Sequence, residues 1–206
     1  ENYMPVISKQ LASRDYSKTQ LIKQADVLMA LYILSDAFTF KTKSNNYHFY
    51  IDRTMHKSSL SAPMNALMAI EVGDRSRAYG LFNTTLRTDI SNIYNNTYEG
   101  MHGASLGGAW QLVINGFVGL RIQRKILSIR PRLPRMWRKV LFCINWRGRF
   151  LRIEVENARV KIQMLAPRKK RKVRLKVFGL PCEIKGSKVF KFERKKSKVK
   201  FKEYYL

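Results

Sequence analysis

Long apolar segments and cysteines are both scarce in this sequence of 206 residues. No stretch approaches the roughly 18 uncharged apolar residues of a membrane-spanning helix, so we expect no contact with a membrane. The two cysteines, Cys143 and Cys182, could form one disulfide at most. Both lie in strand-like runs, which favours buried free thiols in a reducing cytosol. No signal or transit peptide is recognisable at Glu1, and we expect the chain to be a piece of a longer protein.

Acidic side chains are also few, with 14 Asp and Glu against 40 Lys and Arg and a formal net charge of +26. Residues 1–125 carry 14 basic and 9 acidic side chains (+5), whereas residues 126–206 carry 26 and 5 (+21). Apolar residues still make up 45%, which is typical of a globular chain and not of a disordered one. The uneven charge predicts two domains, 1–125 and 126–206.

The first region has helical periodicity. Apolar residues in 20–34 recur at helical spacing around most of the circumference, which predicts a helix capped by Thr19 or Ser17. A second helix is predicted over 61–72, with Pro63 in its first turn and Gly73 after its end.

Two further helices and a loop complete the helical pattern. Asp74 is placed to cap a third helix that runs through Leu86, and the Asn- and Gly-rich residues 90–103 predict an ordered loop. A fourth helix is predicted from about 104 to 119. Each of its glycines costs about 1 kcal/mol relative to alanine, which indicates close approach to another helix or to a ligand.

After Arg124 the period changes from 3.6 to 2. Alternating apolar and polar residues predict antiparallel strands, each with one buried face, over 139–146, 151–155, 160–164, 172–177 and 198–202. The residues 146–149, Trp-Arg-Gly-Arg, predict a hairpin turn. The fold class is therefore α+β, a helical domain followed by a small antiparallel β-sandwich.

Four motifs, in this order and spacing, together resemble glycoside hydrolase family 65, which contains maltose, trehalose and kojibiose phosphorylases. They are LIKQADV (21–27), HKSSLSAP (56–63), EGMHGASLGGAW (99–110), and PRLPRMW (131–137) running into FCINWRG (142–148). The resemblance covers roughly residues 18–160. It implies the last helices of an α/α six-hairpin barrel, followed by the C-terminal sandwich.

The resemblance also implies a reaction. In this family phosphate attacks the anomeric carbon of an α-glucosyl disaccharide, a Glu protonates the departing oxygen, and the product is β-glucose 1-phosphate. That general acid lies upstream of the Lys-Gln motif in the family, and no matching segment precedes Lys23 here. We therefore expect no turnover from these 206 residues alone, and no cofactor or metal beyond inorganic phosphate as co-substrate.

Six residues match the family's binding positions. Lys23 and Gln24 match the pair that holds glucose in the family. Their ammonium and amide groups supply the donors and the acceptor that sugar hydroxyls need. The family's phosphate site is matched by Ser58, Ser59, His102 and Gly103. Hydroxyl donors and backbone N–H groups at the start of a helix favour a bound anion.

Alternatives from the residues alone are that the Lys-Gln pair is the wet edge of a buried helix and that His102 is an ordinary loop histidine. An inverting hydrolase would need a carboxylate near position 102 to activate water, so the histidine favours a phosphorylase. Glu99 is a nearby carboxylate that could activate water, so a hydrolase remains an alternative. Many relatives have His at the position of Asn65, so the sequence does not determine which disaccharide is the substrate.

The basic half has a rival interpretation. Residues 167–173 look like a nuclear-import signal or a basic hairpin loop, and a cationic sandwich of a non-catalytic product could bind polyanions. The aromatics fall mostly at expected core positions and no RNA-binding motif accompanies them, so we expect a solvated cationic face without nucleic acid. The expected partners are a disaccharide and phosphate in the cytoplasm, and the full-length protein could be a homodimer.

Overall fold

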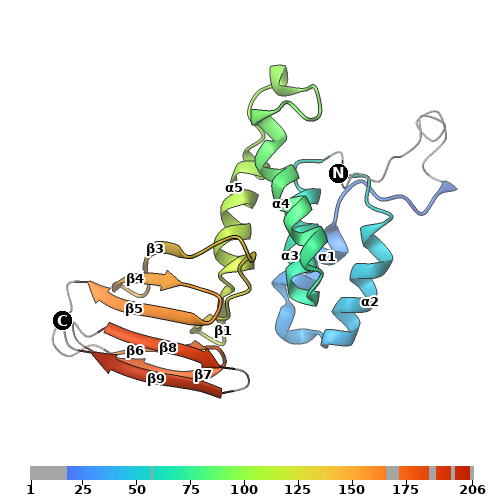
Figure 1. Ribbon diagram of the computed structural model, residues 1–206. Coiled ribbons are helices and arrows are strands. Elements are labelled where there is room, and N and C mark those ends of the chain that lie inside the picture. The colour runs from blue at the N-terminus through green and yellow to red at the C-terminus, as the bar shows by residue number, and fades with distance from the viewer. Residues whose placement is uncertain (1–17, 57, 166–171, 186–188, 196–197, 205–206) are drawn as a thin grey trace. The chain divides into compact units, whose positions relative to one another are not determined.

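The predicted change from helices to strands corresponds to two units of the chain, Glu1–Gly116 and Phe117–Leu206 (Figure 1). The computed structural model describes residues 18–56, 58–165, 172–185, 189–195 and 198–204. Described helices lie in the first unit and strands in the second. The units divide before the predicted boundary near residue 125, because the strands from Leu120 onward already belong to the second unit.

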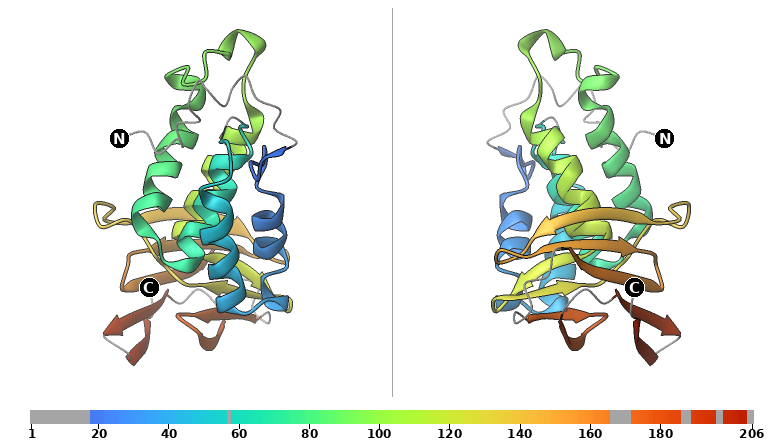
Figure 2. Two further views of the ribbon diagram at one scale, coloured as in Figure 1. Left: turned by 90° about the vertical axis from the view of Figure 1, so that its right-hand side faces the viewer. Right: turned by 90° about the vertical axis from the view of Figure 1, so that its left-hand side faces the viewer.

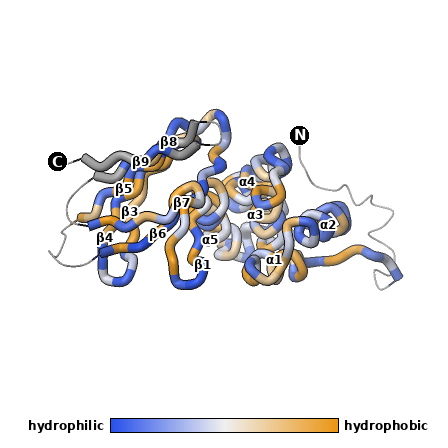
Figure 3. Tube along the Cα trace, turned by 90° about the horizontal axis from the view of Figure 1, so that it is seen from below, coloured by the Kyte–Doolittle hydropathy of each residue, from blue (hydrophilic) through white to orange (hydrophobic). Residues whose placement is uncertain are grey.

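The helices of the first unit surround α3. The described residues form α1 (Asp26–Ile33), α2 (Phe40–Ile51), α3 (Ser61–Val72), α4 (Arg75–Ile90) and α5 (Gly103–Gln111), with the 3-10 turns η2 (Ser35–Ala37) and η3 (Thr97–Glu99) and the π-helical turn η4 (Leu112–Phe117). α3 contacts each of the other four α-helices. Figure 2 shows the helices of this unit gathered into one bundle. Its Ala66, Leu67 and Met68 are at most 1% exposed. Figure 3 accordingly colours most of α3 as hydrophobic.

The ends of α3 and α4 confirm the predicted start and stop signals. Pro63 lies in the first turn of α3, and Gly73 follows its last residue with a left-handed φ of 94°. The Asp74 carboxylate then accepts a hydrogen bond of 3.2 Å from the Arg77 N–H at the start of α4.

The helix predicted over 20–34 was wrong at its start, because α1 begins only at Asp26. Residue Ile22 instead forms a parallel bridge with Thr54, donating to the Arg53 carbonyl and accepting from the Met55 N–H, both at 2.9 Å. Thr19 accepts from the Leu21 N–H and caps no helix, and Ser17 lies outside the described residues. Pairing with a distant segment therefore overrides the local helical pattern. The sequence pattern also missed α2.

Buried polar side chains join α2 to the helices after it. The Lys43 ammonium is 3.1 Å from Glu71 Oε1 and donates to Ser35 Oγ at 2.9 Å. The Lys43 side chain is 9% exposed and that of Glu71 is 22% exposed. Tyr47, which is fully buried, donates to Asp74 Oδ2 at 3.0 Å, and burial raises the pKa of its hydroxyl well above the ordinary value. Both buried polar side chains of α2 therefore have polar partners inside the unit.

Glycines let α5 pack closely on α3. A Cβ at Gly108 would lie 2.5 Å from Pro63 Cβ, and one at Gly116 would lie 2.7 Å from Ile70 Cδ1. Gly116 lies in η4, which directly continues α5. The contacts advance from Pro63 to Ile70 along α3 and from Gly108 to Gly116 along α5 and η4, so α3 and α5 run parallel, with both N-termini at one end. This confirms close helix approach at Gly108 and Gly116, whereas a Cβ at Gly107 would meet no atom within 4 Å.

The second unit contains two sheets in its described residues. One has the order β1-β2-β6-β7, and the other β3-β4-β5-β8-β9. The strands are β1 (Leu120–Gln123), β2 (Ile126–Ile129), β3 (Val140–Asn145), β4 (Phe150–Val155), β5 (Arg159–Leu165), β6 (Val173–Val177), β7 (Leu180–Ile184), β8 (Val189–Lys195) and β9 (Lys198–Tyr204).

Alternating burial along these strands confirms the predicted sandwich. In β4, Leu151, Ile153 and Val155 are each 0% exposed, whereas the alternate residues Phe150 and Arg152 face solvent. Leu175 and Val177 are buried in the same way in the other sheet. One pairing departs from the antiparallel prediction, because β2 and β6 are parallel. A parallel pair needs a long connection, and β3 to β5 supply it.

The turn between β3 and β4 has the predicted hairpin geometry. Trp146 and Arg149 exchange backbone hydrogen bonds of 2.8 and 3.1 Å. Arg147 and Gly148 between them have φ values of 53° and 73°, as a type I′ turn requires. Of the predicted basic run, residues 167–171 lie outside the described residues, while Lys172 pairs with Glu183 at 2.8 Å.

The two thiols differ in exposure. Both are free, as expected. Cys143 in β3 is exposed, which corrects the prediction that it is buried, because its side chain lies on the solvent side of an edge strand. Cys182 in β7 is half-buried, and burial raises the pKa of its thiol to about 12. Among the described residues, no helix is both long and apolar enough to cross a bilayer.

Candidate functional site

Lys23 and Gln24 lie in the bend between the Ile22–Thr54 bridge and α1. They are not the wet edge of a helix, since no helix has begun at this point. The Lys23 side chain is exposed, while its carbonyl accepts a hydrogen bond of 3.1 Å from Ser61 Oγ. Ser61, at the start of α3, is itself 0% exposed. The segment proposed to hold glucose is therefore fixed to the N-terminus of α3.

The serines Ser58 and Ser59 lie in the turn that leads into α3. The Ser58 hydroxyl accepts from the Leu60 N–H at 3.3 Å, and its carbonyl accepts from the Ser61 N–H at 3.0 Å. Both serines are partly exposed. Their hydroxyls therefore lie at a helix N-terminus, where the backbone dipole favours an anion.

His56 holds the start of this turn in an unusual conformation. Its φ is 51°, its side chain is 2% exposed, and its carbonyl accepts a hydrogen bond of 2.8 Å from the Tyr94 hydroxyl. Burial lowers the pKa of the imidazole to about 4, so the ring is neutral at physiological pH. The bond from Tyr94 ties the loop that follows α4 to the serine turn.

His102 is the N-cap residue of α5, and its own side chain makes no capping hydrogen bond. The ring instead pairs with Asp89 in the last turn of α4, with 2.5 Å between Nδ1 and Oδ1. The other carboxylate oxygen, Oδ2, accepts from the His102 backbone N–H at 2.9 Å. On the opposite side of the ring, Asn96 Nδ2 lies 3.0 Å from Nε2. The hydrogen bonds from His102 lower the pKa of the Asp89 carboxyl.

The serine turn and the start of α5 are in direct contact. Ser105 Oγ donates to the Ser59 carbonyl at 3.4 Å, and Ser105 is buried. Because α3 and α5 are parallel, this contact joins two helix N-termini at the same end of the unit. Gly103 is exposed, and a Cβ there would meet no atom within 4 Å. The backbone at Gly103 is therefore open to approach.

The structure thus brings together the segments that carry the predicted residues. Ser61 joins Lys23 to α3, and Ser105 joins Ser59 to α5. In the described part of the chain, no hydrogen bond connects the side chains of Lys23 or Gln24 with His102. The connection between the two predicted subsites therefore runs through the backbone near Ser61 and Ser105.

Sequence reasoning missed Asp89, Asn96 and Tyr94. One signal was available, because Asp89 stands in the last turn of a helix, where the macrodipole disfavours a negative charge. An acidic residue at such a position indicates a specific cationic or N–H partner. Asn96 and Tyr94 lie in the loop, where sequence spacing does not reveal contacts.

The arrangement can bind an anion. It offers serine hydroxyls, two helix N-termini, an open backbone at Gly103 and an imidazole. Of the nearby carboxylates, Asp89 is bound to His102, and exposed Glu99 accepts from the Tyr98 hydroxyl at 3.4 Å. Among the described residues, no cluster of His, Cys, Asp or Glu is arranged to hold a metal ion.

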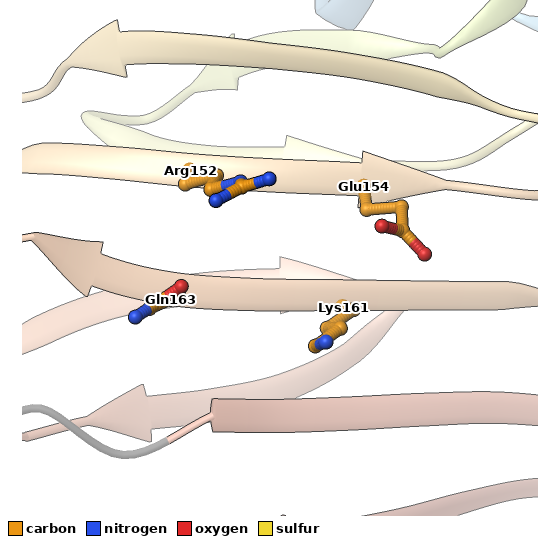
Figure 4. A pocket seen from close by; sticks show the side chains of 4 residues that line it. All are labelled: Arg152, Glu154, Lys161 and Gln163. Carbon is orange, nitrogen blue, oxygen red and sulfur yellow. The ribbon is translucent and has the colours of Figure 1, made fainter. Parts of the chain in front are cut away.

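A separate hollow lies on the solvent face of the five-stranded sheet in the second unit. It has a volume of about 350 Å³ and is lined by Arg152 and Glu154 of β4 and by Lys161 and Gln163 of β5 (Figure 4). None of the predicted site residues lines it.

Comparison with known proteins places both units in one family. Residues 2–111 match the family model described as "Glycosyl hydrolase family 65 central catalytic domain", and residues 120–182 match its "C-terminal domain". The chain is 41% identical over 177 residues to the kojibiose phosphorylase of Caldanaerobacter subterraneus subsp. tengcongensis, covering 85% of this chain and 23% of that protein.

Other relatives have different substrates in their names. The maltose phosphorylase of Bacillus subtilis is 35% identical over 82% of this chain and 22% of its own length. The α,α-trehalose phosphorylase of Geobacillus stearothermophilus is 36% identical over 71% and 19%. The chain thus spans about a quarter or less of these relatives.

A solved structure gives the same answer for the fold. The protein described as "Putative kojibiose phosphorylase from human microbiome" matches with a TM-score of 0.80 and 29% identity, over 92% of this chain and 28% of that one. The match confirms the predicted α+β arrangement. The chain therefore belongs to glycosyl hydrolase family 65, with its helical unit in the central catalytic domain and its sandwich in the C-terminal domain.

Proposed function

We propose that this chain is part of an inverting disaccharide phosphorylase. A phosphate oxygen forms a bond to the anomeric carbon of an α-glucosyl disaccharide, and the glycosidic bond breaks. The departing oxygen takes a proton from a Glu outside these residues. The products are β-glucose 1-phosphate and the second sugar. The kojibiose, maltose and trehalose phosphorylases among the relatives support this reaction class.

The observation that carries the proposal is the Ser105–Ser59 contact of 3.4 Å. It joins the N-termini of parallel α3 and α5 beside Ser58, Ser59, His102 and Gly103. These groups bind phosphate, while Lys23 and Gln24 hold the glucose. Phosphate is itself a charged nucleophile, so the site needs no carboxylate base. Inorganic phosphate is the co-substrate, and no cofactor takes part.

The setting of the enzyme is part of the same proposal. It acts in the cytoplasm on a small disaccharide and phosphate. For the full-length protein we consider a homodimer. The sandwich carries a solvated cationic face and binds no nucleic acid. Its few acids form ion pairs with the surrounding cations, as Glu183 does with Lys172.

The test is an assay of the protein expressed from its complete reading frame. Kojibiose, maltose and trehalose are incubated with and without inorganic phosphate, and the anomer of any glucose 1-phosphate is determined by NMR. Phosphate-dependent release of the β-anomer is expected from at least one disaccharide. Release of free glucose that does not depend on phosphate would identify an α-glucoside hydrolase, with exposed Glu99 as the first carboxylate to substitute.

A non-catalytic product is the remaining alternative. It would turn over none of the three sugars with or without phosphate. Its sandwich would instead bind DNA or RNA with an affinity that falls steeply as salt is raised. That combination of results would replace the phosphorylase proposal.

A further inference from the structure

The ring of His102 is held from both sides. Asp89 uses both carboxylate oxygens, one on ring Nδ1 and the other on the backbone N–H of the same residue. One side chain therefore fixes both the orientation of the imidazole and the first residue before α5. Because Nδ1 is taken, Nε2 is the ring atom that remains to face a ligand.

Asn96 occupies that remaining nitrogen. Its Nδ2 lies 3.0 Å from Nε2, whereas its Oδ1 is buried and has no hydrogen-bond partner. A neutral ring accepts from Nδ2. Rotation of the amide by half a turn would place Oδ1 against Nε2, and a doubly protonated ring would then donate to it. The amide can therefore hold Nε2 in either protonation state.

Binding of an anion at Nε2 requires the doubly protonated ring. To bind phosphate, Nε2 must carry a proton, so that a ring whose Nδ1–H is bound to Asp89 becomes a cation. The Asp89 carboxylate favours that cation by its charge. Carboxylate partners of metal-bound histidines act in the same way, fixing the ring and tuning the atom that faces the ligand.

We propose that Asp89 is a positioning residue that presents His102 Nε2 to the phosphate, and that Asn96 holds Nε2 until phosphate displaces it. The first part rests on the proposed function of His102. Asp89 touches no substrate and acts only through the histidine. Its location in the last turn of α4 is explained by this partner, since the helix terminus alone disfavours it.

Asp89→Asn is the main test, in the protein expressed from its complete reading frame. The amide can accept one of the two N–H bonds but carries no charge to stabilise the imidazolium. The KM for phosphate is expected to rise about 10- to 100-fold, by analogy with the loss seen when partners of metal-binding histidines are removed. The KM for the disaccharide stays within twofold. Equal changes in both constants would show a merely structural role and overturn the proposal.

Asp52→Asn is the matched control. It makes the same change from carboxylate to amide at an exposed side chain that pairs with Arg77. Its phosphate KM should equal that of the unmodified protein. A rise as large as that of Asp89→Asn would show that loss of negative charge anywhere in the helical unit is responsible, and not the hydrogen-bonded carboxylate.

Asn96→Ala tests the second part. Removing the amide leaves Nε2 open to phosphate, so the phosphate KM should stay level or fall. A tenfold rise would show that Asn96 supports the bound anion and does not give way to it.

Direct binding separates this inference from the proposed function. Inorganic phosphate is titrated into the unmodified protein, Asp89→Asn and His102→Asn by calorimetry, with no turnover required. Binding that both substitutions weaken supports the positioning role even if no disaccharide is cleaved. Phosphate affinity that neither substitution changes contradicts it even if phosphorolysis is observed.

Discussion

The two units of this chain handle charge in different ways. In the helical unit, polar side chains meet in specific pairs that are buried or partly buried: Lys43 with Glu71, Tyr47 with Asp74, and Asp89 with His102. In the sandwich, two of the described acids, Glu183 and Glu193, each face more than one cation. Glu183 lies within 4 Å of Lys172, Arg174 and Lys185.

This contrast separates two uses of charge. A buried pair in the helical unit determines how helices pack or how a ring is oriented, so loss of either partner is felt locally. A surface acid in the sandwich reduces repulsion among cations, and its geometry matters little. The difference can be measured by substitutions of the same kind in the two units.

The largest effect is expected from Glu71→Gln. It leaves the Lys43 ammonium buried without its counter-charge, and breaking a buried pair costs about 3–5 kcal/mol. The lower end applies because Glu71 is 22% exposed. The measurement is the free energy of unfolding of the helical unit from denaturant titration. Asp52→Asn, which removes an exposed partner of Arg77 in the same unit, is the control and should change little.

The next effect concerns pH. Because the folded pKa of His56 is about 4 against an ordinary 6.5, the unfolded chain binds a proton between these values that the folded chain excludes. Stability should therefore fall as pH drops from 6.5 to 4, by up to about 1.4 kcal/mol per pH unit.

His56→Asn checks the source of this slope, since Asn tolerates the left-handed backbone and does not titrate. The variant should lose that part of the dependence. His48→Asn, at an exposed histidine of α2, should keep it. An unchanged slope in the His56 variant would assign it to other groups.

A pair of glycines tests the packing of the site. Gly108→Ala puts a Cβ 2.5 Å from Pro63 Cβ, and such overpacking costs about 1–3 kcal/mol. Gly103→Ala meets open space and should leave the unfolding free energy unchanged, while it weakens phosphate binding measured by calorimetry. Equal stability losses in the two variants would contradict the difference between a packing glycine and a ligand-facing one.

The smallest effect is expected in the sandwich. Glu183→Gln removes a partly exposed acid that pairs with three cations, and all three cations are themselves exposed. The thermal midpoint should stay within error at physiological salt and fall slightly only at low salt. A loss as large as that of Glu71→Gln would erase the contrast between the units.

Local signals predicted the elements that depend on local chemistry. Pro63, Gly73 and Asp74 mark the ends of α3 and α4, and the alternation through Leu151 and Ile153 marks a half-buried strand. Local signals failed where pairing with a distant segment determines the backbone conformation. Ile22 is apolar at helical spacing, yet it pairs with Thr54. In α2 the buried position 43 is a lysine, so no apolar pattern revealed the helix.

The site divides in the same way. The four motifs predicted Ser58, Ser59, His102 and Gly103 as phosphate-site residues, and the structure places their segments at one end of the helical unit. The partners of His102 come from a helix end and a loop, with no spacing rule that joins Asp89 to position 102. Long-range hydrogen bonds of this kind are visible only once the chain is folded.

The pairing of β1 with β2 has a practical consequence for expressing the sandwich. The antiparallel register joins Leu120 to Ile129 and Gln123 to Ile126. A fragment cut at residue 126, where the charge changes, would lack β1 and expose the hydrogen-bonding edge of β2. Open edges of this kind recruit strands from other molecules and promote aggregation. Soluble preparations should therefore begin at Phe117, where the second unit itself begins.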